Sequence, residues 1–393
     1  MLSSKLHRTS TAAELVLSND DLFVEILLRL PIRSLLRFKS VSKRWLSIIS
    51  NPNFSHRRTI SHHHNPTPSG IFFPRLNSKS PSFDFVNFTT SPSRPPFESL
   101  NFPDEKHEFL ILQSCNGLFL CSSNNGNYSI RDYYIHNPTT NHLTKLPELQ
   151  EGRVFGLNLA FDPLRSSDYK VICIWYSEAF PNAYQIDMYS SVTGPWRRVQ
   201  GLFSAPLSMR FDCGVYWNNA VHWISTLENS LYFDLCEEKL HELPMPRVPY
   251  GLEERRVEYF GNCGGNLHLI EVYEAEMELN VYQMQDNHSG WFVKYRVDLR
   301  GVSVGFPEMI PSVMDVDMGF FPKFSVAAIV EGIDQEAYVV LEVEGKIVRV
   351  NVESGRFERL GQIENDGRTS EVPITVGFGR IDAFLYIENL ACV

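Results

Sequence analysis

Residues 17–45 read LSNDDLFVEILLRLPIRSLLRFKSVSKRW and carry more large apolar side chains than so short a stretch can bury by itself. Leu22, Phe23, Ile26, Leu27 and Leu30 recur at helical spacing and form one stripe. Ser18 and Asp21 have the spacing of a capping box, and Asp20 and Asp21 suit the positive end of a helix dipole. Pro31 cannot continue a helix. The pattern predicts a helix that ends at this proline and leaves apolar side chains without cover.

Two more short helices are predicted after that proline. Residues 34–38 form the second, and residues 40–50 form the third, which Pro52 ends. Three helices of this length make a marginal core, in which each helix hides only one stripe. The surplus apolar side chains then form an exposed patch, which marks a protein interface. The candidate interface residues are Leu17, Leu22, Ile26, Leu27, Leu30, Pro31, Leu35, Leu36, Val41 and Trp45.

An alternative is that these helices pack their apolar surface against the rest of the chain. Residues 55–69 argue against it, because SHRRTISHHHNPTPS has the composition of a polar linker. The first residues are also polar and are predicted to be disordered. The predicted organisation is a disordered start (1–14), a helical domain (15–54), a linker (55–69) and a second domain (70–393).

Charge is distributed unevenly along the 393 residues. Residues 1–60 hold ten Lys or Arg against four Asp or Glu, whereas the whole chain has a net charge of −10. A basic head on an acidic body predicts an acidic partner for the head. The basic residues alternate with Leu and Ile rather than clustering, which favours a protein partner and no nucleic acid.

Cysteine usage and hydropathy bear on the compartment. The seven cysteines form no Cys-x-x-Cys pair, which is typical of reduced thiols rather than of a disulfide framework. No apolar run approaches the roughly 18 residues of a membrane span, and the first residues lack the apolar core of a signal peptide. We therefore expect the protein in the cytoplasm or the nucleus, without a membrane partner.

From residue 70 onward the residue pattern changes to short runs of β-branched and aromatic residues between turn signals. A unit of strand, polar turn and strand recurs at 135–147, 188–199, 232–244, 281–295 and 350–360. The corresponding positions 137, 190, 234, 283 and 351 are 53, 44, 49 and 68 residues apart. The first three steps lie near the roughly 40–50 residues of a propeller blade. The long last step contains the irregular stretch 301–323, which is predicted to be an insertion.

A propeller also satisfies the physics of these strands. One four-stranded blade cannot bury both of its faces, whereas blades packed around an axis bury them and protect the edges. Segments 70–102 and 373–389 flank the repeated units and are predicted to share one blade, closing a ring of about six. The predicted fold is an α + β multidomain chain, with a small three-helix domain before an all-β propeller-like domain. An irregular pair of β-sandwiches is the alternative.

The sequence holds no strong catalytic or metal-binding pattern. His62-His63-His64 lies without Cys or carboxylate neighbours, and residues 261–266 (GNCGGN) read as a tight turn without the ending of a phosphate loop. No Gly-x-Ser-x-Gly nucleophile elbow is present, and Cys115 is predicted to be buried and inert. We expect no enzyme activity, no cofactor and no metal. A propeller hydrolase or lectin is the alternative, and it requires paired carboxylates or an aromatic platform at the axis.

Residues 17–58 resemble an F-box. The resemblance rests on residues 26–31 (ILLRLP) and residues 35–45 (LLRFKSVSKRW). Ser18 stands where the family has a proline, and Ser also caps helices well. Family members lay this surface on an acidic adaptor of the Skp type, which agrees with the basic head.

Most of the remainder resembles the plant F-box-associated domain. The pieces that carry the resemblance are residues 114–118 (SCNGL), 137–140 (NPTT), 159–163 (LAFDP), 168–171 (DYKV) and 217–223 (WNNAVHW). The S-locus F-box proteins of pollen share this layout. The resemblance implies a substrate receptor of an SCF-type cullin–RING ubiquitin ligase. Its partners would be a Skp-family adaptor, through it a cullin and a RING subunit, and an unknown protein client.

The client is expected to contact loops on one face of the ring, at 148–156, 176–184, 201–210, 245–257 and 301–323. Two of these loops, 245–257 and 301–323, rank first for their length and proline content. A third hypothesis is a scaffold protein whose F-box no longer binds an adaptor. The replacement of the family's proline by Ser18 is compatible with it. The candidate client-binding residues are Pro246, Arg247, Tyr250, Phe306 and Pro311.

Overall fold

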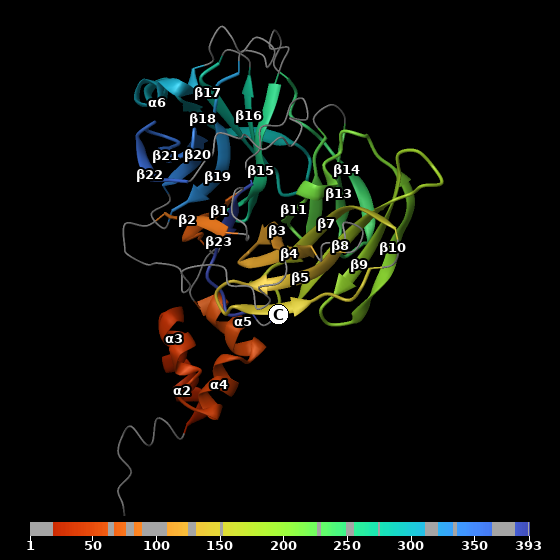
Figure 1. Cartoon of the computed structure of the whole chain (residues 1–393), viewed down its shortest axis with the longest axis vertical. Coiled ribbons are helices and arrows are strands. Elements are labelled where there is room, and N and C mark those ends of the chain that lie inside the picture. Colours follow the sequence, from red (N-terminus) through yellow and green to blue (C-terminus); the bar gives the residue numbers. More distant parts are fainter. Residues whose placement is uncertain are drawn as a thin grey trace, which may run out of the picture.

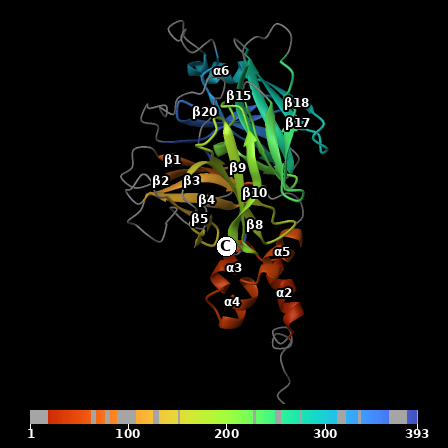
Figure 2. The same ribbon diagram turned by 90° about the vertical axis from the view of Figure 1, so that its right-hand side faces the viewer.

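The computed structural model describes residues 19–61, 67–75, 82–88, 108–124, 131–149, 152–225, 229–248, 255–273, 276–310, 321–332, 336–363, 382–391 and 393. Within these ranges, the first helices stand as a separate lobe at one end of the molecule, below a body of β-sheets (Figure 1, Figure 2). The start predicted to be disordered lies outside the described residues, as do Leu17, Tyr250 and Pro311.

The helical lobe consists of α2 (Asp20–Leu28), α3 (Ile32–Phe38), α4 (Lys43–Ile49) and α5 (Pro52–Ser61). Its first cap differs from the predicted one, because the Asn19 side chain accepts the backbone N–H groups of Asp21 and Leu22. Ser18, the predicted cap, lies outside the described residues. Pro31 separates α2 from α3, as predicted from its fixed ring.

The predicted linker is wrong over residues 55–61, which continue α5 as a further helix. The polar composition concealed one apolar anchor, since Phe54 is buried in the core of the lobe. Arg57 pairs with Glu25 at 2.7 Å, and the Arg58 guanidinium donates to the Leu28 carbonyl oxygen at 2.7 Å. Contacts with α2 therefore stabilise a helix that its own composition does not predict, and the helical domain reaches residue 61 instead of 54.

Six antiparallel sheets follow within the described residues. Five are four-stranded, each made of consecutive strands (β3–β6, β7–β10, β11–β14, β15–β18 and β19–β22), and the sixth joins β1, β2 and β23. This arrangement confirms the six-bladed propeller and excludes a pair of β-sandwiches. The inner and second strands are β3 (Glu108–Cys115), β4 (Leu118–Asn124), β7 (Arg153–Phe161), β8 (Tyr169–Tyr176), β11 (Val215–Trp217), β12 (Ala220–Trp223), β15 (Arg255–Cys263), β16 (Asn266–Tyr273), β19 (Ser325–Glu331) and β20 (Ala337–Val343).

The repeated unit found in the sequence corresponds to the two outer strands of each four-stranded blade. The outer pairs are β5 (Arg131–Asn137) with β6 (His142–Lys145), β9 (Ala183–Ser190) with β10 (Gly194–Ser204), β13 (Ser230–Asp234) with β14 (Lys239–Leu243), β17 (Glu278–Met284) with β18 (Trp291–Asp298), and β21 (Lys346–Asn351) with β22 (Phe357–Gln362). The insertion at 301–323 contains α6 (Arg300–Gly305) and a 3-10 turn, η2 (Pro307–Met309), and a second such turn, η1 (Phe211–Cys213), precedes β11.

Segments from the two ends of the chain close the ring, as predicted. Strand β1 (Gly70–Arg75) pairs with β2 (Ser82–Asn87) on one side and with β23 (Phe384–Tyr386) on the other. The Phe72 ring contacts Tyr386 at a centroid distance of 5.8 Å and Phe119 of the next blade at 6.0 Å. A closed ring buries the outer blade faces that an open stack of blades would expose, and it leaves only short, protected edges.

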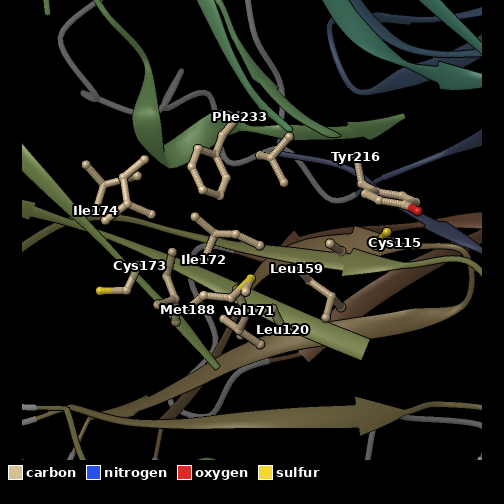
Figure 3. Packing of buried hydrophobic residues seen from close by; sticks show 14 of the residues in the cluster. Cys115, Leu120, Leu159, Val171, Ile172, Cys173, Ile174, Met188, Tyr216 and Phe233 are labelled. Carbon is tan, nitrogen blue, oxygen red and sulfur yellow. The ribbon is translucent and has the colours of Figure 1, made fainter. Parts of the chain in front are cut away.

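Apolar side chains pack between blades rather than in one centre. In Figure 3, Leu120 of β4, Leu159 of β7, Ile172 of β8 and Phe233 of β13 lie together, and all four are fully buried. They come from three different sheets. Each blade therefore completes the core of its neighbour.

Tryptophans of the repeated unit join neighbouring blades. Trp196 of β10 donates its indole N–H to the Pro147 carbonyl oxygen at 2.9 Å. Trp291 of β18 makes the same bond to the Pro244 carbonyl oxygen at 2.6 Å. Both prolines lie within two residues of the end of the outer strand of the preceding blade, so each tryptophan joins two blades.

Replacing Trp291 with Phe removes this hydrogen bond and keeps an aromatic ring. We expect the free energy of unfolding to fall by about 1 kcal/mol, the usual net contribution of one hydrogen bond. Urea unfolding of the full chain measures the change. Phe292→Leu, at the exposed neighbouring ring, is the control, and a Trp291→Phe variant as stable as the wild type would contradict the role given to the indole.

Four of the innermost strands share a bulge. In β3, β7, β15 and β19 one extra residue interrupts the pairing with the second strand, and these residues are Leu112, Phe155, Glu258 and Ala327. A bulge bends the strand and re-aims the extra side chain. In three blades that side chain is apolar, whereas in β15 it is a carboxylate.

Candidate functional site

The helical lobe exposes a patch of aliphatic side chains. Leu22 and Ile26 of α2 are 50% and 47% exposed, Val41 is 59% exposed, and Leu46 of α4 is 46% exposed. We call these four residues the aliphatic patch. Exposed apolar side chains gathered on so small a lobe mark a site where another protein binds.

Contacts between α2 and α4 hold the patch together. The Phe23 ring meets the Trp45 ring edge-on at a centroid distance of 4.8 Å. The Arg44 guanidinium lies over Phe23, 5.3 Å from the ring centroid, and pairs with Asp20 at 2.5 Å. The exposed faces of the two helices are therefore parts of one surface.

The predicted interface residues divide into three groups. Leu22, Ile26, Pro31 and Val41 are exposed, as an interface requires, while Leu30, Leu36 and Trp45 are half-buried. Leu27 and Leu35 were predicted to bind a partner, and this is wrong, because both are fully buried in the core of the lobe. A stripe that looks continuous in the sequence thus covers an inner and an outer face.

Leu46 is the patch residue that the sequence reasoning missed. It directly follows Trp45 in the third helix, whose predicted apolar stripe is Val41, Trp45, Ile48 and Ile49. A large apolar side chain outside the buried stripe was the available signal.

The lobe also packs on the propeller. The alternative prediction, that these helices pack against the rest of the chain, is therefore correct in part. The His56 ring nitrogen Nδ1 lies 3.1 Å from the Pro163 carbonyl oxygen, in the turn between β7 and β8. Leu390, after the last strand, joins the apolar core of the lobe. The aliphatic patch nevertheless remains exposed to solvent.

Chain direction places the predicted client loops on the face of the propeller away from the lobe. In an antiparallel blade, the turns after the first and third strands share one face, and the remaining connections share the other. The lobe contacts the β7–β8 turn, which follows a first strand. All five predicted loops are connections of the second kind. In both views α6, from the loop 301–323, lies far from the lobe (Figure 1, Figure 2).

The predicted client-binding residues differ in their exposure to solvent. Arg247 is exposed and Pro246 is half-buried. Phe306 was predicted to bind a client, and this is wrong, because its ring packs into the core under α6, 5.9 Å from the Phe357 centroid. Its neighbours Val304 and Ile310 are exposed instead, at 85% and 55%.

The central channel contains a cavity of about 160 Å³ lined by inner strands of the blades. Two carboxylates line it, Asp212 and Glu258. Arg210 holds Asp212 at 3.0 Å, and the Arg256 guanidinium donates to Glu258. The described lining also includes the aromatic residues Tyr216, Tyr259, Phe260 and Phe384. Each carboxylate has its own arginine, so the two do not form the carboxylate pair that the hydrolase alternative requires.

Glu258 is nevertheless an unusual group. Its side chain is fully buried, and the oxygen Oε2 has no hydrogen-bond partner among the described residues. Burial raises the pKa of Glu258 to about 7, although the charge and the hydrogen bond of Arg256 lower it. The carboxyl group therefore takes up a proton in the folded state at a pH at which the unfolded chain stays ionised.

The stabilising effect of Glu258 is fully present below its ordinary pKa of 4.5 and is lost as pH rises through 7. We expect Glu258→Gln, which cannot ionise, to gain roughly 3 kcal/mol of unfolding free energy over the wild type between pH 4.5 and pH 8. Urea unfolding at the two pH values measures the gain. The exposed Glu237, replaced with Gln, is the control, and a pH-independent difference at position 258 would contradict the assignment.

Other groups noted in the sequence have structural roles or lie outside the described ranges. Burial raises the pKa of Cys115 to about 12, which keeps the thiol protonated. Gly264 and Gly265 have positive φ in a tight β15–β16 turn, as predicted. The histidines at 62–64 lie outside the described residues, among which no three His, Cys, Asp or Glu gather as metal ligands. None of the helices described is long and apolar enough to cross a membrane.

Comparison with known families agrees with this division into two parts. Residues 19–57 match the family described as F-box domain, and residues 77–298 match the F-box associated beta propeller domain. The chain is an F-box protein. A relative that is 36% identical, the Arabidopsis thaliana F-box protein At5g07610, aligns over 98% of this chain and 94% of its own length. The second domain of this F-box protein is thus an F-box associated propeller.

More distant matches include a further plant F-box protein and a solved structure of low similarity. The Arabidopsis thaliana F-box protein At1g32420 is 29% identical over 62% of this chain and 80% of its own length. Among solved structures, a nidogen/laminin complex aligns over 75% of this chain and 93% of that chain, with a TM-score of 0.38 and 7% identity. The narrower resemblance to pollen S-locus proteins stays a prediction.

Proposed function

We propose that this F-box protein is the substrate-recognition subunit of an SCF-type cullin–RING ubiquitin ligase. The single observation that carries the proposal is the aliphatic patch, which remains exposed on an F-box that is otherwise packed. A Skp-family adaptor covers this patch and connects the chain to a cullin and a RING subunit. The basic charge of the lobe complements an acidic adaptor.

The propeller holds a protein client on the face away from the lobe. Loops of several blades meet on that face, and Arg247, Val304 and Ile310 are exposed there. The chain itself makes or breaks no bond. It raises the effective concentration of client lysines near the activated ubiquitin that other subunits carry. The free thiols of the described cysteines suit the cytoplasm or nucleus, where we place the protein.

Reconstitution tests this function. The purified full chain is mixed with a purified Skp-type adaptor and passed over a size-exclusion column, and then a cullin–RING pair is added. We expect first a binary complex and then a complex of all four proteins. A chain that elutes alone from both mixtures would contradict the proposal and would favour a scaffold without a ligase.

A further inference from the structure

Residues 387–391 run between the F-box and the propeller and present alternate side chains to each. Asn389 and Ala391 are buried against the propeller, whereas Leu390, 3% exposed, belongs to the F-box core. Glu388 interacts electrostatically with the positive charges of Arg33 and Arg58 on the F-box. An alternation of period two is that of an extended chain. This segment, which we call the 387–391 segment, therefore touches both domains along its length.

On the propeller side, buried amides hold the 387–391 segment. Asn137 donates its side-chain N–H groups to the Asn389 Oδ1 at 2.9 Å and to the Ala391 carbonyl oxygen at 2.8 Å. Asn389 donates its side-chain N–H to the Asn116 carbonyl oxygen at 3.2 Å and its backbone N–H to Thr139 Oγ1 at 3.2 Å. Buried polar groups bonded in this way fix a single arrangement.

A glycine makes room for the segment. Gly117 follows Asn116 in the β3–β4 turn and has a φ of +90°. A Cβ at this position would lie 2.1 Å from the Asn389 side-chain nitrogen and 2.4 Å from the Ile387 carbonyl oxygen. Any side chain here would therefore displace the 387–391 segment. The Asn-Gly of SCNGL and the Asn and Thr of NPTT, which marked the family in the sequence, form the seat of this segment.

On the F-box side, the contact is apolar and central. Leu390 packs in the same cluster as Phe23, Leu27, Leu35 and Phe54, which come from three of the four described helices of the lobe. Among the described residues, Leu390 is thus the side chain that the second domain contributes to the F-box core. A rotation of the F-box would pull Leu390 out of that core or Asn389 out of its seat.

We propose that the 387–391 segment fixes the orientation of the F-box relative to the propeller, with Asn389 and Leu390 as positioning residues. The purpose of this fixed orientation rests on the proposed function, because a ligase requires a set distance between the adaptor and the client. The segment sets that distance from the face opposite the client, without contacting adaptor or client. A flexible joint would spread client lysines over many positions relative to the activated ubiquitin.

Electron spin resonance distance measurement tests the proposal on the full chain. Spin labels are attached through genetically encoded ketone residues at exposed positions 47, on α4, and 192, in the β9–β10 turn. We expect one narrow distance in the wild type and loss of that narrow peak in Leu390→Asp. Because Leu390→Asp can also unfold the F-box, Gly117→Ala is the second variant, since it displaces the segment and leaves the F-box sequence untouched. The conservative variant Leu390→Met should keep the narrow peak of the wild type.

Gly194→Ala is the matched control. Gly194 also has a positive φ, +73°, in a turn of the propeller, but a Cβ there meets nothing within 4 Å. Narrow peaks in both Leu390→Asp and Gly117→Ala overturn the proposal, and so does equal broadening in Gly194→Ala. Titration calorimetry with a purified Skp-type adaptor separates this question from the proposed function. We expect the same affinity for wild type and Gly117→Ala, whereas failure of both to bind rejects the ligase function and leaves the distance result valid.

Discussion

The double variant Ile26→Asp/Val41→Asp should bind a Skp-type adaptor about a hundredfold more weakly than the wild type. Both side chains are about half exposed in the free protein, so the adaptor would bury them. Burial of one fully exposed aliphatic side chain contributes roughly 1.5–3 kcal/mol, and about half of that remains to be gained at each position. The two losses together therefore come to roughly 1.5–3 kcal/mol, which is about ten- to a hundredfold in Kd. Aspartate adds a carboxylate that has to be desolvated and that repels an acidic adaptor.

Titration calorimetry gives the two dissociation constants. Leu207→Asp/Val304→Asp makes the same chemical change at two exposed positions of the propeller and should leave the affinity unchanged. Circular dichroism checks that the F-box stays helical, which is expected because both replaced side chains point to solvent. Substituting Leu27 or Leu35 would not test the interface, since each fills the F-box core and its loss would unfold the lobe. Wild-type affinity in the double variant would reject the aliphatic patch as the adaptor site.

Acid should destabilise the propeller through His222, which lies on β12 where two blades meet. His222 Nδ1 lies 3.2 Å from the Val215 carbonyl oxygen, and Nε2 lies 2.8 Å from His288 Nε2 of the next blade. Burial, reinforced by the charge of His288, lowers the pKa of His222 to about 3. The nearby Asp234 acts on His288 in the opposite sense, and His241 stacks on Tyr232 beside it. The folded protein therefore keeps this imidazole neutral in weak acid.

The unfolded chain protonates the same imidazole near pH 6.5, its ordinary pKa. The stabilising effect of neutral His222 is therefore present above pH 6.5 and is lost as pH falls toward 3. We expect His222→Asn to be less stable than the wild type at pH 7.5, and the gap to narrow by roughly 3 kcal/mol at pH 4.5. Asn keeps a donor for the Val215 carbonyl oxygen.

Urea unfolding at a series of pH values measures both proteins. His142→Asn is the control for the change of residue type, because His142 is exposed. A gap between wild type and His222→Asn that stays constant from pH 7.5 to pH 4.5 would show that His222 does not titrate as its burial requires.

Local patterns were enough to predict the two domains. Apolar spacing and Pro31 predicted separate helices, and the repeated strand-turn-strand unit predicted the outer hairpins of the blades. The prediction that segments near residues 70 and 384 share a blade was also confirmed, because a ring of blades leaves no other partner for them. These features depend on neighbours a few residues apart or on the count of repeats, and both are visible in the chain.

Which face of each helix is buried could not be predicted in the same way. Leu27 and Leu35 belong to apolar stripes yet lie inside, whereas Leu46 lies off its stripe and is exposed. Helix α5 has a polar composition and forms because α2 lies beside it. In the insertion, Phe306 is covered by residues from another strand of the sheet below.

The kinds of domain, their order and the closing of the ring follow from local patterns, because helical period, strand period and repeat length are set by residues close together in the chain. Which side chains of the F-box remain for a partner, and how the F-box is seated, depend on the folded arrangement. Asn116, Asn137 and Asn389 meet across more than two hundred residues. Their contact depends on the position of every blade between them, and no local period carries that information.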